Sequence, residues 1–214
     1  MIFDVLTVAV LGFVGFRLVT TARTAVTRDS RRHIVQIVRG VRLHHLLLAP
    51  VALIGVLVAA YGLLLIPGMS FGWWTAIGGT GNIVTGGTSR TSGTALEWIV
   101  PALFLLLLFP ALPIFAEREE LMFRRGAEGW SWRHRAWMGL KFGLIHLIMG
   151  IPIGVALALS VGGWYFQWAY LRGYRRHGDS AAAGVMESTR SHFAYNAEIL
   201  TLALVVLAVN GSLS

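Results

Sequence analysis

The chain has 214 residues, of which 56% are hydrophobic and only 13% are charged. This composition is too apolar for one soluble core of that size and predicts an integral membrane protein. The net charge is +8, and the chain contains no cysteine, which excludes disulfides, thiolate nucleophiles and thiolate metal sites.

Six apolar segments are long enough, or nearly long enough, to cross a bilayer as helices. A helix rises about 1.5 Å per residue, so roughly 20 apolar residues span the hydrocarbon core. Gly150, Ile151 and Pro152 interrupt one very long apolar run, which predicts a helical hairpin. We therefore expect an all-α polytopic membrane bundle of about six transmembrane helices, at residues 1–20, 43–67, 95–116, 136–150, 151–171 and 192–210.

Three units follow along the chain. Residues 1–72 are expected to form an N-terminal transmembrane pair with a basic cytoplasmic connection, in which 20–42 is either a helix at the headgroups or a solvated linker. Residues 73–94, rich in Gly and Thr, are expected to form an external loop, because no Lys-Ser/Thr follows the sequence GGTGN to make a phosphate loop. Residues 95–210 are the expected helical core.

The basic residues concentrate in the connections after the first, third and fifth segments. Positively charged loops stay in the cytoplasm, so we expect both termini outside and Glu119 near the cytoplasmic side of the cell membrane. The charge thus indicates topology and attraction to lipid rather than nucleic-acid binding. The basic residues of the first connection are Arg17, Arg23, Arg28, Arg31, Arg32, Arg39 and Arg42. Those of the third are Arg118, Arg124, Arg125, Arg133, Arg135 and Lys141, and those of the fifth are Arg172, Arg175, Arg176 and Arg190.

The stretch AEREELMFRRG brings acidic residues to the end of an apolar segment. A charged residue at membrane depth costs roughly 2.5–3.5 kcal/mol on insertion scales, so an acidic pair there indicates function. Glu120 and Arg124 are four residues apart and can pair on one helix face, which leaves Glu119, about 100° away, free for another neighbour. The alternative interpretation is a solvated helix end.

Two further polar motifs follow in apolar segments. His146 comes one helical turn after Phe142, and His192 lies four residues before Asn196, on the same helix face. A lone histidine in such a segment is more often hydrogen-bonded to a neighbouring helix than catalytic. By the expected topology, however, all three motifs enter the membrane from the cytoplasmic side, which favours one shared site.

Glu119-Glu120-x-x-x-Arg124, Phe142-x-x-x-His146 and His192-x-x-x-Asn196, in that order, resemble the CAAX protease and bacteriocin-processing (CPBP, abortive-infection type) family of intramembrane endopeptidases. The resemblance covers residues from about 95 to 210. It implies hydrolysis of a peptide bond in a membrane-associated peptide or protein. By this resemblance, Glu119 would be the general base, and His146 would be its partner. His192 and Asn196 would stabilise the oxyanion, and Glu120, Arg124 and Phe142 would shape the site.

General chemistry is compatible with these roles, because water-activated amide hydrolysis needs a base and donors for the oxyanion. Two histidines and a glutamate could also hold Zn²⁺. Asn196 beside His192 suits carbonyl binding instead, and the resemblance implies a metal-free mechanism, so we expect no cofactor. The alternatives from other classes are a non-enzymatic scaffold or bacteriocin-immunity factor, and a small transporter or proton relay. His44 and His45 are interpreted as interfacial residues.

The sequence also makes geometric predictions. Glu119, His146, His192 and Asn196 should converge on one polar cavity at the cytoplasmic leaflet, while Glu120 turns toward Arg124. The first two spans should pack outside the core. Small residues allow helices to approach closely in lipid, so glycines are expected at helix contacts. These are Gly139, Gly143, Gly150, Gly154, Gly162 and Gly163.

Overall fold

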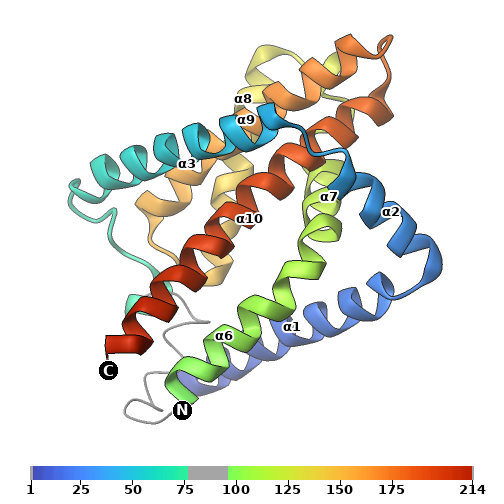
Figure 1. Ribbon diagram of the computed structural model, residues 1–214. Coiled ribbons are helices and arrows are strands. Elements are labelled where there is room, and N and C mark those ends of the chain that lie inside the picture. Colours follow the sequence, from blue (N-terminus) through green and yellow to red (C-terminus); the bar gives the residue numbers. More distant parts are fainter. Residues whose placement is uncertain (1, 77–95, 214) are drawn as a thin grey trace.

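The computed structural model describes residues 2–76 and 96–213, and all of the regular elements in these ranges are helices (Figure 1), as predicted for the fold class. The external loop expected at 73–94 therefore lies mostly outside the described residues. The elements are α1 (Ile2–Ala25), α2 (Arg28–Arg39), α3 (Leu43–Leu64), α4 (Trp73–Ala76), α6 (Leu96–Leu108), η2 (Phe109–Ala111), α7 (Leu112–Phe123), η3 (Ala127–Gly129), α8 (Trp132–Ile145), η4 (His146–Met149), α9 (Ile153–Arg176) and α10 (Ala181–Leu213).

The predicted hairpin is confirmed as helices α8 and α9. Ser131 caps the start of α8, where its side chain accepts a hydrogen bond from the backbone N–H of His134. The helix ends in the 3-10 turn η4 and at Gly150, whose φ of +77° is a left-handed conformation that favours glycine. Pro152 then precedes α9 and has the fixed φ that suits the start of a helix.

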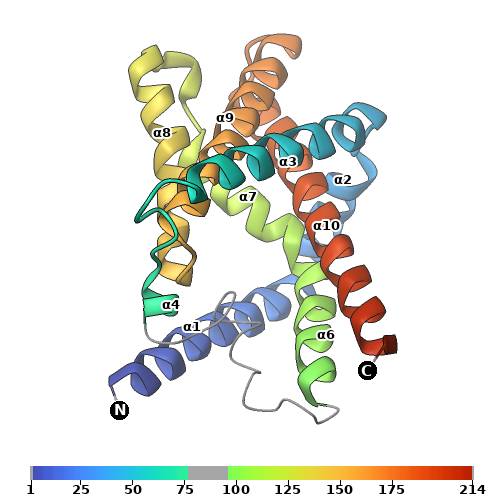
Figure 2. The ribbon, with the colours of Figure 1, turned by 90° about the vertical axis from the view of Figure 1, so that its left-hand side faces the viewer.

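The 3-10 turn η2 divides the apolar segment predicted at 95–116, and α7 continues beyond that segment to Phe123. Pro110 and Pro113 lie in or beside this turn, and each lacks the backbone N–H that a continuous α-helix would use. Figure 2 shows that α7 leaves the line of α6 at this point and runs toward α8 and α9. The bend therefore directs the acidic stretch of α7 into the bundle.

Helices α8 and α9 pack closely because glycine lies at their contact. A Cβ atom on Gly143 would overlap the carbonyl of Ala156, and one on Gly163 would lie 2.6 Å from the carbonyl of Gly139. Gly150 and Gly154 also meet neighbouring segments, whereas Gly162 has only ordinary van der Waals neighbours. The prediction of close glycine contacts is thus confirmed except at Gly162.

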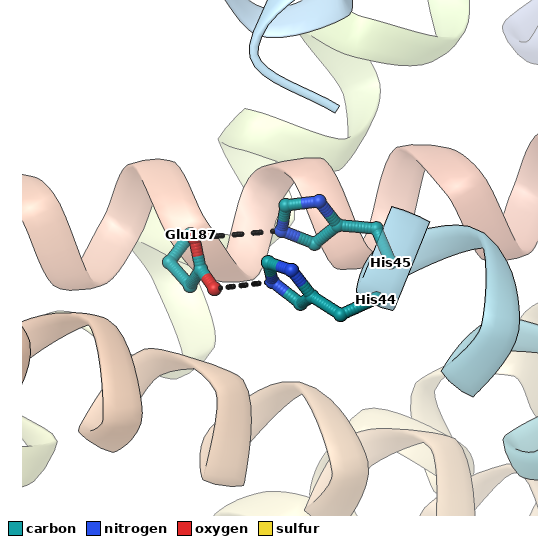
Figure 3. Close-up of side chains that lie close together, drawn as sticks. All are labelled: His44, His45 and Glu187. Atoms are coloured by element: carbon teal, nitrogen blue, oxygen red, sulfur yellow. Dashed lines mark hydrogen bonds and ion pairs between the residues drawn. The ribbon is translucent and has the colours of Figure 1, made fainter. Parts of the chain in front are cut away.

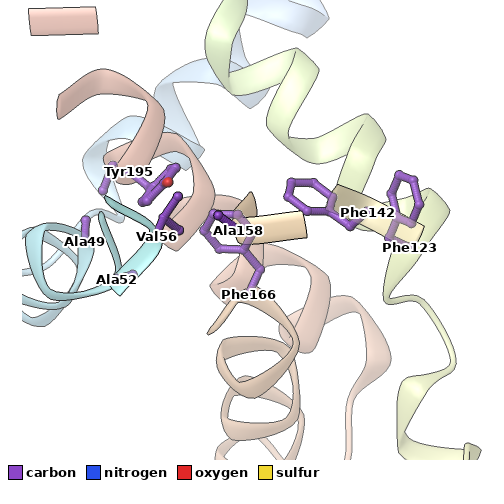
Figure 4. Packing of buried hydrophobic residues seen from close by; sticks show 9 residues of the cluster. Ala49, Ala52, Val56, Phe123, Phe142, Ala158, Phe166 and Tyr195 are labelled. Atoms are coloured by element: carbon purple, nitrogen blue, oxygen red, sulfur yellow. The ribbon is translucent and has the colours of Figure 1, made fainter. Parts of the chain in front are cut away.

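Helix α3 shares the central core and does not lie outside it. It contributes Ala49, Ala52 and Val56 to the same cluster that contains Phe142 and Phe166, as Figure 4 shows. The small side chains of α3 let it cross both α9 and α10 at short range. The prediction that both N-terminal spans pack outside the core is therefore wrong for α3. Helix α1, by contrast, mainly touches η2.

Residues 28–39 form a regular helix, α2, rather than a linker. Thr27 caps its start, and the apolar side chain of Ile37 is fully buried. Polar contacts fix its position, since His33 Nε2 lies 2.7 Å from Glu117 Oε1 of α7 and Arg190 Nη2 donates to the Gln36 carbonyl. Helix α2 is therefore an amphipathic element attached to α7 and α10.

One described helix, α3, is long and apolar enough to cross a membrane. Both termini lie at one end of the molecule, and the turn between α9 and α10 lies at the other (Figures 1 and 2). The basic connection after α7 also lies at this second end. In Figure 2, however, α3 runs across α9 and α10, so six membrane spans and their orientation stay a prediction.

Candidate functional site

Glu120 lies at the centre of a buried polar group formed by α7, α9 and α10. Its side chain is fully buried, and Oε1 lies 3.1 Å from Arg124 Nη1, which confirms the predicted pair. The same oxygen lies 2.8 Å from His192 Nδ1, and Ser188 Oγ donates to Oε2. Both carboxylate oxygens therefore have partners, as a buried charge requires.

Arg124 is equally buried, although arginine is rarely found inside a helical bundle. Its guanidinium carbon lies 4.3 Å from the centroid of the Phe142 ring and 5.4 Å from that of Phe166. Nη2 also donates to the Gly163 carbonyl at 3.3 Å. The aromatic rings, shown in Figure 4, and the Glu120 carboxylate together stabilise the positive charge. Arg124 is a permanent cation, and its Nη1 lies 3.1 Å from Glu120 Oε1, so the Glu120 carboxylate stays ionised.

His192 lies between two carboxylates. Its ring stacks on Phe166 with centroids 4.1 Å apart, its Nδ1 contacts Glu120, and its Nε2 lies 3.8 Å from Glu119 Oε2. An ionised carboxylate only accepts hydrogen bonds, so His192 Nδ1 carries the proton that points at Glu120. In a neutral ring Nε2 then presents a lone pair toward Glu119.

His146 has a similarly fixed ring. Its Nδ1 donates to the Phe142 carbonyl at 2.8 Å, so in the neutral form Nε2 is again the acceptor. The ring of Phe142 separates the two histidines, with centroids 5.2 Å from His146 and 5.6 Å from His192. Within the described residues His146 makes no hydrogen bond to Glu119 or His192.

The predicted set of residues is therefore brought together in part. Glu119, Glu120, Arg124 and His192 form one connected group, and Phe142 touches both Arg124 and His192. His146 joins the group only through Phe142. Asn196 lies half-buried one turn beyond His192 and forms no hydrogen bond with the described residues. Its distance from the two carboxylates is thus longer than a direct contact.

Ser188 is a residue of this group that the sequence analysis missed. It is fully buried and lies four residues before His192, on the same face of α10. Its hydroxyl contacts Glu120 and the carbonyl of Phe166. The Ser-x-x-x-His spacing was the available signal, but serine at helical spacing is too common to be noticed without the partner helix.

A second polar cluster joins α3, α9 and α10 at Glu187, and Figure 3 shows three of its residues, His44, His45 and Glu187. Glu187 Oε1 lies 2.9 Å from His44 Nε2 and 3.4 Å from Arg172 Nη1, and Oε2 lies 3.4 Å from His45 Nε2. Hydrogen bonding from His45, followed by that from His44, lowers the pKa of Glu187 to about 2, although burial opposes the shift. We call these four residues the Glu187 clasp. His44 and His45, which the sequence predicts as residues of the membrane–water interface, therefore both contact Glu187 of α10.

The clasp has a donor set that could be read as a metal site, since the ligand atoms of His44, His45 and Glu187 lie within 4.8 Å of one another. Its hydrogen bonds argue against that reading. His45 Nδ1 accepts the backbone N–H of Arg42 at 2.8 Å, so the neutral ring carries its proton on Nε2, where a metal would need a lone pair. The Arg172 cation also occupies one side. The geometry fits an ion-paired clasp better.

Comparison with protein-family models, with curated proteins and with solved structures gives no match to this chain.

Proposed function

We propose that the protein is a multi-pass membrane endopeptidase that hydrolyses a peptide bond of a membrane-associated peptide or protein with activated water. One observation carries the proposal. The buried imidazole of His192 lies between two carboxylates. One is the buried carboxylate of Glu120, which is paired with Arg124, and the other is the half-exposed carboxylate of Glu119. This arrangement orients a base, because Glu120 holds Nδ1 of His192 while Nε2 faces the Glu119 carboxylate.

The membrane part of the proposal is supported by the surface of the helices. Large apolar side chains are exposed along α3, and others are exposed near the end of α10. A surface of this kind is too apolar for water and suits lipid. On α3 they include Leu46, Leu47, Val51, Ile54, Leu57 and Val58, and on α10 Leu202, Val205, Val206 and Val209. We assign the remaining predicted spans, with both termini outside, by the positive-inside rule.

In the proposed reaction a water molecule lies between Glu119 and Nε2 of His192. Its oxygen attacks the scissile carbonyl carbon, and its proton passes to Glu119 or to His192. When the tetrahedral intermediate collapses, the C–N bond breaks and this proton moves to the leaving amine. Glu120 keeps its charge throughout and holds Nδ1–H of His192, so it orients the ring.

The fixed proton on Nδ1 changes one role that the resemblance implies. A neutral His192 has no second N–H to offer an oxyanion, so we assign it to proton transfer. The side-chain amide of Asn196, one turn further along α10, then remains as the oxyanion donor. His146 presents the Nε2 lone pair from the other side of Phe142 and would accept a hydrogen bond from water or substrate.

The proposal is tested with Glu119→Gln in the full chain reconstituted into liposomes that carry a library of membrane-tethered peptides. We expect cleavage to fall by roughly 10²–10⁴-fold, the usual contribution of a general base. Glu198→Gln is the matched control, because Glu198 is a half-buried glutamate of α10 outside the group and its loss should leave cleavage unchanged. Equal cleavage by Glu119→Gln and wild type would refute the peptidase.

A further inference from the structure

Helix α9 carries an ordered series of aromatic and basic residues on its outer face. Trp164 and Trp168 are 46% and 48% exposed, whereas the residues around them on α9 are mostly buried. Arg172, Arg175 and Arg176 follow at helical spacing, within about 120° of the Trp164 position. The face therefore changes from aromatic to basic toward the end of the helix.

The basic part of this face encloses a groove. Its volume is about 380 Å³, and its lining consists of Trp168, Leu171, Arg172, Arg175 and Arg176. The guanidinium of Arg172 lies over the Trp168 ring, 5.4 Å from its centroid. This contact and the Glu187 clasp hold Arg172 in place, while Arg175 and Arg176 are exposed. No acidic residue is among these lining residues. Arg172 is already paired with Glu187, so Arg175 and Arg176 supply most of the positive charge that is complementary to an anion.

The order of the residues identifies the source of that anion. Tryptophan is enriched at the level of lipid headgroups, and arginine binds phosphate through paired N–H donors. Helix α9 rises about 1.5 Å per residue, so the three arginines lie roughly 12–18 Å beyond Trp164. In the predicted span 151–171, Trp164 and Trp168 therefore lie beside the acyl chains, and the arginines follow at the level of the headgroups. A free anion would not need the tryptophan surface, whereas an acyl chain would lie against it.

We infer that the α9 groove is a binding site for an anionic phospholipid, with the phosphate at Arg172, Arg175 and Arg176 and an acyl chain along Trp168 and Trp164. The inference rests on the membrane embedding in the proposed function and not on peptidase activity. A protein that cleaves nothing can therefore pass the test, and an active peptidase can fail it.

The test titrates phosphatidylglycerol into the full chain in zwitterionic micelles and measures the bound lipid by native mass spectrometry. Each basic residue near an anionic surface contributes about 1 kcal/mol, or about fivefold, so Arg175→Gln with Arg176→Gln should weaken binding about 25-fold. The control is Arg125→Gln with Arg133→Gln, which removes the same charge from two exposed arginines elsewhere at this end of the bundle. We expect little change from it.

A second pair of variants separates the groove from charge alone. Trp168→Ala should weaken binding although every charge remains, whereas Trp132→Ala, at a more exposed tryptophan of α8, should not. Equal effects of the two arginine pairs, or no effect of Trp168→Ala, would overturn the site. Displacement of the lipid by inorganic phosphate at matched concentration would assign the groove to a free anion and overturn it as well.

Discussion

Glu119 and Glu120 are neighbours in the sequence, yet the fold gives them different environments. Glu120 is fully buried against Arg124, Ser188 and His192, whereas the Glu119 side chain is 33% exposed and approaches only His192. Adjacent residues on a helix point about 100° apart, so the Glu120 side chain can anchor the bundle while the Glu119 side chain faces a different neighbour. In the proposed function, Glu120 therefore has the structural role and Glu119 the chemical one.

This division can be measured with Glu120→Gln. The amide preserves the shape but leaves the buried Arg124 cation without its counter-ion, and breaking a buried pair costs about 3–5 kcal/mol. We expect this loss in the free energy of unfolding, measured by denaturant titration in detergent micelles. Glu119→Gln, at a half-exposed position, should unfold like wild type. Equal stability of Glu120→Gln and wild type would show that the Glu120–Arg124 pair does not hold the bundle.

At the scale of the helices, the α8–α9 contact determines where Phe142 lies. Gly143 and Gly163 let the two backbones approach, and Phe142 is thereby pressed between Arg124 and the two histidines. A helix displaced by the width of one methyl group would move this ring. The contact between helices is therefore part of the site as well as of the fold.

Gly143→Ala tests that contact. The new methyl group would meet the Ala156 carbonyl and the Ser160 hydroxyl, and overpacking of this kind costs about 1–3 kcal/mol. We expect a lower melting temperature and reduced cleavage. Gly15→Ala in α1, where nothing lies near the added atom, is the control and should melt no lower than wild type. A Gly143→Ala protein with unchanged melting would indicate that the two helices can move apart freely.

At the scale of the whole molecule, the Glu187 clasp ties three helices that lie far apart in the sequence. Glu187 precedes Ser188 and lies five residues before His192 on α10, so the clasp also fixes the height and rotation of the helix that carries both. Its partners come from α3, through His44 and His45, and from α9, through Arg172. The N-terminal half of the chain is thereby linked to the candidate site.

The clasp predicts a dependence of stability on acid. The pKa of Glu187 is lowered from 4.5 to about 2, with hydrogen bonding from His45 as the largest cause. A lowered carboxyl pKa stabilises the fold fully above pH 4.5, and the contribution is lost as the pH falls toward 2. The stability difference between wild type and Glu187→Gln should therefore be larger at pH 6 than at pH 3. A difference independent of pH would contradict the ion-paired clasp.

The sequence by itself determined the helices and the contacts within a helix. Apolar run lengths and the Gly150–Pro152 break place α8, α9 and α10 correctly, because these signals act over one or two turns. The Glu120–Arg124 pair was predictable for the same reason, since an i,i+4 spacing brings two side chains together in any α-helix.

Only the tertiary structure decided which helices meet and at which rotation. The Ser188 and His192 contacts to Glu120, the clasp that joins His44 to Glu187, and the place of α3 in the core link residues tens of positions apart. No local pattern encodes such a contact, because a rotation of about 100° about one helix axis would direct a different residue to the same neighbour. Helix packing fixes that rotation, through small residues at the contacts and buried charges that accept few partners.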